Sequence, residues 1–97
     1  MKRIINRKRY DTDAAVEIAS DSYWDGSNLD RGGCNTYLYR TVLGAYFVKT
    51  TSMWEGEHDD LYPVTRDSAI DLYEGQLRHD QSESFDKAFP GVEVVDA

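Results

Sequence analysis

The sequence predicts a small single α+β domain. We expect an N-terminal β-hairpin, a helix, an antiparallel sheet of about three further strands, and then one longer and one short C-terminal helix. Three patterns support this fold class: a β-branched run with a turn dipeptide opens the chain, residues 35–49 alternate in polarity, and apolar residues recur at helical spacing between residues 65 and 77. Because 97 residues have room for one hydrophobic core, we expect one domain over residues 1–97.

The first ten residues predict the N-terminal hairpin. Ile4 and Ile5 are β-branched, Asn6 and Arg7 supply the turn, and residues 8–10 return as the second strand. Asn-Arg is a weaker turn than Asn-Gly, because a type I′ turn requires a positive φ at both central positions. We therefore expect strain in the backbone at Arg7.

Residues 12–22 predict the first helix. Asp11 or Thr12 can cap it, and Asp13 in the first turn interacts favourably with the helix dipole. The apolar face of this helix consists of Ala14, Ala15, Ile18 and Ala19. The glycine-rich polar stretch at residues 26–35 then predicts a loop.

Residues 35–49 show the clearest strand pattern in the chain. Side chains of different character alternate on both sides of a turn expected around Leu43 and Gly44, which predicts a second β-hairpin. A polar loop follows over residues 50–60. Residues 61–64 predict a short strand, and Pro63 places it at the edge of the sheet because proline cannot donate a ladder hydrogen bond.

The last third of the chain predicts two helices. Thr65 can cap the longer one, whose apolar face consists of Ala69, Ile70, Tyr73 and Leu77. Three acidic residues share an adjoining face of the same helix: Asp67, Asp71 and Glu74. Ser82 can cap a short helix that includes Phe85 and Phe89 and stops at residues 90–91, and an extended tail follows at residues 92–95.

Charge is distributed unevenly along the chain. Residues 1–9 carry five basic residues and no acidic residue, although the whole chain has a net charge of −7. Residues 55–86 hold ten acidic residues against two arginines, a local charge of −8. A surface of that kind repels nucleic acid and attracts basic grooves. We therefore expect a protein partner with a basic surface and no direct binding of nucleic acid.

Metal binding and catalysis are both disfavoured by the residue spacing. The acidic loop with Glu55, Glu57, His58, Asp59 and Asp60 lacks the spaced ligands and the central glycine of a calcium loop, so a solvated loop is favoured. The two histidines and one cysteine have no zinc-site spacing. Cys34 follows two glycines with no base nearby in the sequence, and the glycines lack the lysine of a phosphate loop. We expect neither an enzyme nor a cofactor.

The aromatic residues leave two readings open. Tyr37, Tyr39 and Phe47 on strands suggest a stacking platform for single-stranded nucleic acid, but such platforms have basic grooves. We favour a division of the aromatic residues between the core and a protein interface.

The longest apolar run, residues 42–48, is too short to span a bilayer, and the basic N-terminus lacks the apolar segment of a secretory signal. Cys34 is the only cysteine, so no internal disulfide is possible. We expect a cytoplasmic protein, without a membrane partner, that is a monomer or a homodimer.

Five segments of the chain carry a resemblance to known proteins: residues 2–6 and 8–15 at the N-terminus, and then residues 38–41, 44–47 and 62–65 before an acidic helix. With these segments, the chain as a whole resembles a family of short acidic proteins encoded on phages and mobile elements. The family usually has glycine where this chain has Arg7. The setting, size and acidity of the family are similar to those of anti-CRISPR proteins, so the resemblance implies evasion of host defence.

These observations lead to one leading hypothesis and one alternative. The leading hypothesis is an anti-CRISPR protein in a bacterial host cell, a non-catalytic DNA mimic that occupies the basic DNA-binding region of a CRISPR effector complex. Its expected contact residues are Trp54, Glu55, Glu57, Asp59, Asp60, Tyr62, Asp67, Asp71 and Glu74. The alternative is a regulatory or assembly adaptor of a mobile element, which binds a phage or plasmid protein and touches nucleic acid with the basic hairpin.

Overall fold

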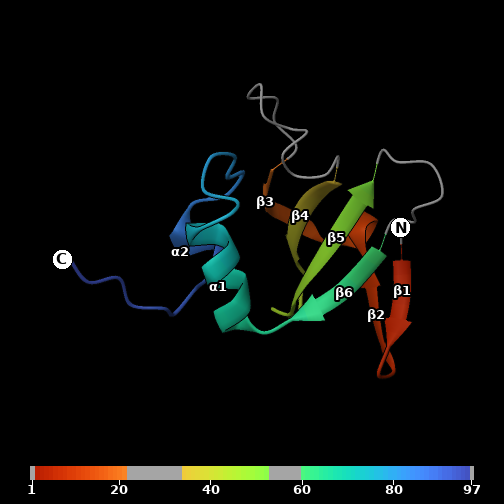
Figure 1. Ribbon diagram of the computed structural model, residues 1–97. Helices are drawn as coiled ribbons and strands as arrows, with labels where there is room; N and C mark the ends of the chain where they lie inside the picture. The colour runs from red at the N-terminus through yellow and green to blue at the C-terminus, as the bar shows by residue number, and fades with distance from the viewer. Residues whose placement is uncertain (1, 22–33, 53–59, 97) are drawn as a thin grey trace.

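The computed structural model describes residues 2–21, 34–52 and 60–96 and confirms the α+β class (Figure 1). Within these residues, six strands, a short 3₁₀ helix and two α-helices follow in the order β1 (Lys2–Ile5), β2 (Lys8–Asp11), η1 (Thr12–Ala14), β3 (Val16–Ser20), β4 (Cys34–Arg40), β5 (Tyr46–Ser52), β6 (Asp60–Val64), α1 (Arg66–Glu74) and α2 (Phe85–Ala88). Strands β1 and β2 form a separate hairpin, and β3-β4-β5-β6 form an antiparallel sheet in that order.

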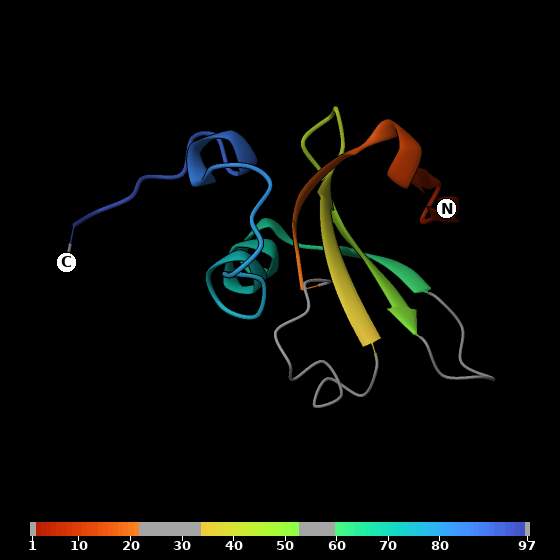
Figure 2. The same cartoon turned by 90° about the horizontal axis from the view of Figure 1, so that it is seen from above.

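The four-stranded sheet is the middle layer of three, with the helices on one face and the β1–β2 hairpin on the other (Figures 1 and 2). Alternation along β5 produces this arrangement, because successive side chains of a strand point to opposite faces. Tyr46 and Val48 belong to the core on the helical side. Phe47 belongs to the second core, where it packs with Tyr10 of β2. The predicted alternation therefore explains how one strand supports both layers.

The N-terminal hairpin forms as the sequence predicts. Ile5 pairs with Lys8, and the two residues between them both have a positive φ, 51° for Asn6 and 65° for Arg7. These angles are typical of a type I′ turn. Asparagine tolerates this conformation, whereas arginine is sterically destabilised in it because its Cβ approaches the backbone.

We therefore expect Arg7→Gly to raise the free energy of unfolding by about 0.5–1 kcal/mol, because glycine adopts a positive φ without steric cost. Urea unfolding of the wild type and the variant measures the change. Arg7→Ala is the matched control, since it removes the same charge and keeps the Cβ. Equal effects of the two substitutions would show that the charge, and not the backbone angle, is responsible.

The helix predicted over residues 12–22 is wrong. Only one turn of 3₁₀ helix forms, with the Asp13 amide donating to Asp11 Oδ1 at 3.0 Å, and β3 follows at once. A β-bulge between Glu17 and Ala19 lets both Ile18 and Ala19 be fully buried. Two adjacent buried residues break the strict alternation of a strand, which is why this stretch matched a helical pattern. The main sheet consequently has four strands.

The β4–β5 hairpin and the edge position of β6 confirm the sequence-based expectations. Gly44 lies in the predicted turn with a φ of 86°, and β5 extends to Ser52, into the stretch predicted as loop. Pro63 pairs with β5 on one side of the edge strand. At the opposite edge, the amides of Ser20 and Ser82 donate to the carbonyls of Asp80 and Ile18, so residues 80–83 cover β3.

Both C-terminal helices exist, with one correction to their caps. Thr65 Oγ1 accepts from the Ser68 amide at 3.1 Å and caps α1 as predicted. The N-cap of α2 is Ser84, so the predicted cap at Ser82 is wrong. The amide of Ser82 instead donates to Ile18 of β3, because this segment pairs with the sheet edge before the helix begins. Leu77 is buried but lies after the end of α1.

Two polar groups tie the α2 segment to the sheet. Arg40 Nη1 donates to Glu83 Oε1 at 2.8 Å, and these side chains are only 21% and 17% exposed. The hydroxyl of Tyr46 donates to the carbonyl oxygen of Ala88 at 2.6 Å. Interactions of this kind are stronger than surface ion pairs, since water screens them less.

Burial raises the pKa of the Tyr39, Tyr46 and Tyr73 hydroxyls above the ordinary value. An unfolded chain therefore loses these protons first, at a pH of about 10. We expect the contribution of these tyrosines to the free energy of unfolding to be constant below that pH, and the free energy of unfolding to fall as the pH rises above it. Urea unfolding between roughly pH 8 and 11 measures the fall, and a free energy that stays constant over this range would contradict it.

Candidate partner-binding surface

Helix α1 presents an exposed acidic face. Its buried residues, Ala69 and Tyr73, lie against the sheet and fix its orientation. Asp67, Asp71 and Glu74 are all exposed. Positions i, i+4 and i+7 share one side of a helix. The structure therefore brings these three predicted contact residues together, and we call them the α1 acidic stripe.

No described basic side chain forms an ion pair with the α1 acidic stripe. Within residues 2–21, 34–52 and 60–96, the ion pairs join Arg3 to Asp60 and Arg40 to Glu83, and neither involves the stripe. Arg78, near the C-terminal end of α1, donates to the Gly75 carbonyl oxygen at 2.9 Å. The carboxylates of the stripe are therefore available to a basic partner.

Two further predicted contact residues, Asp60 and Tyr62, lie on β6 and not on α1. Asp60 opens the strand, and its Oδ1 accepts from Arg3 Nη1 at 2.8 Å in an exposed ion pair. The strand leads from Asp60 to α1 over about 13 Å, at about 3.3 Å per residue. Asp60 thus lies beside the basic hairpin, away from the α1 acidic stripe. Tyr62 is 41% exposed and pairs with Val48.

The remaining predicted contact residues lie outside the described residues: Trp54, Glu55, Glu57 and Asp59. Their role as a contact surface stays a prediction, and the same applies to a metal site that would use them with His58. Among the described residues, no group of three or more histidine, cysteine, aspartate or glutamate side chains is arranged to hold a metal ion.

The described helices also contain none with the length and apolar character needed to cross a membrane.

Five of the eleven basic residues of the chain lie on the β1–β2 hairpin. Lys2, Arg3, Arg7, Lys8 and Arg9 are all exposed there. Of these, only Arg3 has an acidic partner among the described residues, Asp60. Arg3 Nη1 also donates to the Leu61 carbonyl oxygen, so this side chain docks the hairpin on β6. The hairpin and α1 lie on opposite faces of the sheet (Figure 1). The basic hairpin and the α1 acidic stripe are therefore separated by the sheet.

Arg40 and Arg66 are two further basic residues that the sequence analysis did not single out. They line one cavity together with Lys8, although the three come from β4, α1 and β2. No local pattern connects residues so far apart in the chain. Only the pairing of the strands brings them together.

No family model, curated protein or solved structure matches this chain. Function is therefore inferred from the surface chemistry of the described residues.

Proposed function

We propose that this protein is a non-catalytic inhibitor of the anti-CRISPR type, acting in the cytoplasm of a bacterial host. Its acidic surface binds a basic DNA-binding region of a CRISPR effector complex and blocks target DNA. The observation that supports this most is the α1 acidic stripe, three exposed carboxylates on one side of a helix that is packed against the sheet. The resemblance to phage-encoded acidic proteins suggests the class of partner.

The spacing of the stripe suits side chains that bind DNA phosphates. Along a helix, Asp67, Asp71 and Glu74 are separated by about 6 and 4.5 Å. One strand of DNA carries a phosphate for about every 3.4 Å of its axis. The carboxylates of the stripe are therefore separated by between one and two phosphate intervals. Because α1 is packed against the sheet through Ala69 and Tyr73, the carboxylates are held in place before binding.

An exposed aromatic residue on β6 fits an interface. Tyr62 is half-buried by its neighbours on the sheet and keeps 41% of its surface exposed. A ring held in this way loses little conformational entropy on binding and can bury apolar area. We propose Tyr62 as an anchor of this interface. Trp54, Glu55, Glu57 and Asp59 are further proposed contacts, whereas Asp60 is paired with Arg3 beside the hairpin, apart from the stripe.

Phage plaquing on bacterial hosts tests the proposed function. Hosts that carry active CRISPR systems of different types are infected with targeted phage, with and without expression of this protein. We expect restored plaquing in at least one type, because occupied DNA channels cannot bind phage DNA. Expression of folded protein without rescue in any type would contradict the proposal.

The basic hairpin favours a second candidate, an adaptor of a mobile element that touches nucleic acid. Lys2, Arg7, Lys8 and Arg9 are exposed without an acidic partner among the described residues. Hairpins of this charge can contact DNA phosphates. If all four residues bind phosphates, the logarithm of the duplex affinity falls against the logarithm of salt with a slope of about −3.6. An inhibitor that only mimics DNA shows no duplex binding, so a salt titration separates the candidates.

A further inference from the structure

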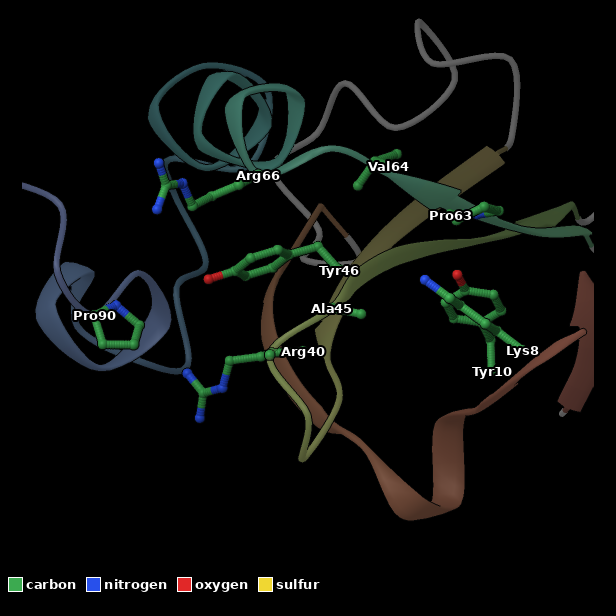
Figure 3. Close-up of a pocket in the computed structure, with 10 residues that line it drawn as sticks. Lys8, Tyr10, Arg40, Ala45, Tyr46, Pro63, Val64, Arg66 and Pro90 are labelled. Carbon is green, nitrogen blue, oxygen red and sulfur yellow. The ribbon is translucent and has the colours of Figure 1, made fainter. Parts of the chain in front are cut away.

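A cavity of about 460 Å³ opens at the end of the sheet where β5 begins and β6 ends (Figure 3). Its volume lies in the range of small-molecule pockets. Ala45, Tyr46, Pro63 and Val64 form the strand side of its wall, and Pro90 lies on the side of α2. The cavity is distinct from the α1 acidic stripe, because none of its lining residues belongs to the stripe.

The charge of this cavity is opposite to that of the chain. Lys8, Arg40 and Arg66 line it, and none of the described lining residues is acidic. The whole chain carries a net charge of −7, so a cavity lined by three cationic side chains is unusual for this composition. Like charges repel one another, and an anion in the cavity would remove that repulsion.

Only one of the three cations is compensated within the described structure. Arg40 donates to Glu83 through two nitrogens, at 2.8 and 3.3 Å. Arg66 and Lys8 are exposed, and no described acidic side chain pairs with either. A guanidinium group has five N–H donors, so Arg40 keeps donors free beyond those that Glu83 and the Lys87 carbonyl oxygen accept.

Tyr46 lies between the two arginines. Figure 3 shows its ring between the side chains of Arg66 and Arg40, with Lys8 on the far side of Ala45. Burial raises the pKa of the Tyr46 hydroxyl, while both guanidinium groups act in the opposite direction. Arg40, Arg66 and Tyr46 all line this one cavity.

We propose that this cavity binds a small phosphorylated molecule, with its phosphate between Arg40 and Arg66. A phosphate monoester carries close to two negative charges at neutral pH and has three acceptor oxygens, which suits two arginines. The cavity is larger than a phosphate group alone, so Pro63, Val64 and Pro90 contact the organic part of the ligand. Lys8 attracts the ligand from the other end of the cavity. This inference is independent of the proposed inhibitor function.

Titration of the isotope-labelled protein, followed by NMR, tests the site. The probes are inorganic phosphate, a ribonucleoside 5′-monophosphate and the same nucleoside without phosphate, with sodium sulfate as the anion control at equal ionic strength. We expect saturable shifts of the Ala45 and Arg66 amides with a dissociation constant of about 1 mM or lower. If the nucleotide binds more tightly than inorganic phosphate, the ligand has an organic part. If the nucleotide and inorganic phosphate bind with equal affinity, the ligand is free phosphate. Shifts that sulfate or the bare nucleoside reproduces would overturn the proposal.

Substitutions place the ligand within the cavity. Arg66→Gln should weaken phosphate binding roughly tenfold, and Lys8→Gln roughly two- to threefold, because Lys8 lies farther from the phosphate. Arg78→Gln is the matched control, since it removes the same charge near the other end of α1 and should leave the affinity unchanged. Equal losses in Arg66→Gln and Arg78→Gln would show a general effect of charge and would overturn the site. Circular dichroism confirms that each variant is folded.

Discussion

We expect Phe47→Ala to lower the free energy of unfolding by about 3–5 kcal/mol, the range for large aromatic residues removed from a core. Phe47 is fully buried on the hairpin side of β5. Its ring centroid lies 5.5 Å from that of Tyr10 on β2 and 5.1 Å from that of Tyr39 on β4. The substitution therefore leaves a cavity between two layers and also removes contacts that hold the hairpin on the sheet.

Urea unfolding measures this effect, and two variants serve as controls. Phe47→Leu keeps most of the volume and should cost clearly less than Phe47→Ala. Val42→Ala should stay within about 0.5 kcal/mol of the wild type, because Val42 is 88% exposed. Hydrogen exchange adds a local measurement, in which residues 2–11 lose protection before the rest of the sheet. A loss below about 1 kcal/mol for Phe47→Ala would show that the hairpin layer is not packed as described.

The largest functional effect is expected when the α1 acidic stripe is reversed to lysine. Asp67→Lys, Asp71→Lys and Glu74→Lys together should weaken binding to the effector more than about 100-fold, because each juxtaposed pair of like charges costs several kcal/mol. The fold should persist, since all three residues are exposed. Lysine near the N-terminus of α1 is unfavourable against the helix dipole and lysine at position 74 is favourable, so these two effects offset each other.

A matched variant separates the position of these charges from their number. Asp86→Lys, Glu93→Lys and Asp96→Lys change the net charge by the same amount, and all three residues are exposed and lie outside α1. We expect this control variant to retain inhibition in the plaquing assay, while the variant of the stripe loses it. Loss of inhibition in both variants would mean that overall charge, and not the stripe, attracts the effector.

Elements defined by neighbouring residues were predictable from the sequence. The type I′ turn follows from Asn6 and the short strands beside it, and α1 follows from its Thr65 cap and from apolar residues at helical spacing. The three acids of the stripe were predictable for the same reason. Residues 16–20 were not, because the bulge in β3 is stabilised by pairing with β4, which lies beyond residues 22–33 in the chain.

The other features that the sequence did not predict depend on contacts between elements far apart in the chain. Asp60 was expected to lie with the stripe, but its ion pair with Arg3 joins residues 57 positions apart. The cavity of Lys8, Arg40 and Arg66 was missed because these residues belong to three elements that only tertiary packing brings together. Local spacing indicates which residues share a face of one element, whereas it carries no information on which elements meet.

Competition with DNA tests the central claim most directly. A CRISPR effector from the type that shows rescue in plaquing is purified and incubated with labelled target DNA and increasing amounts of this protein. We expect displacement of the DNA at a stoichiometric amount of the wild-type protein and of the Asp86, Glu93 and Asp96 control variant, and no displacement by the variant with the stripe reversed. Full displacement by that variant would contradict the assignment of the α1 acidic stripe as the docking surface.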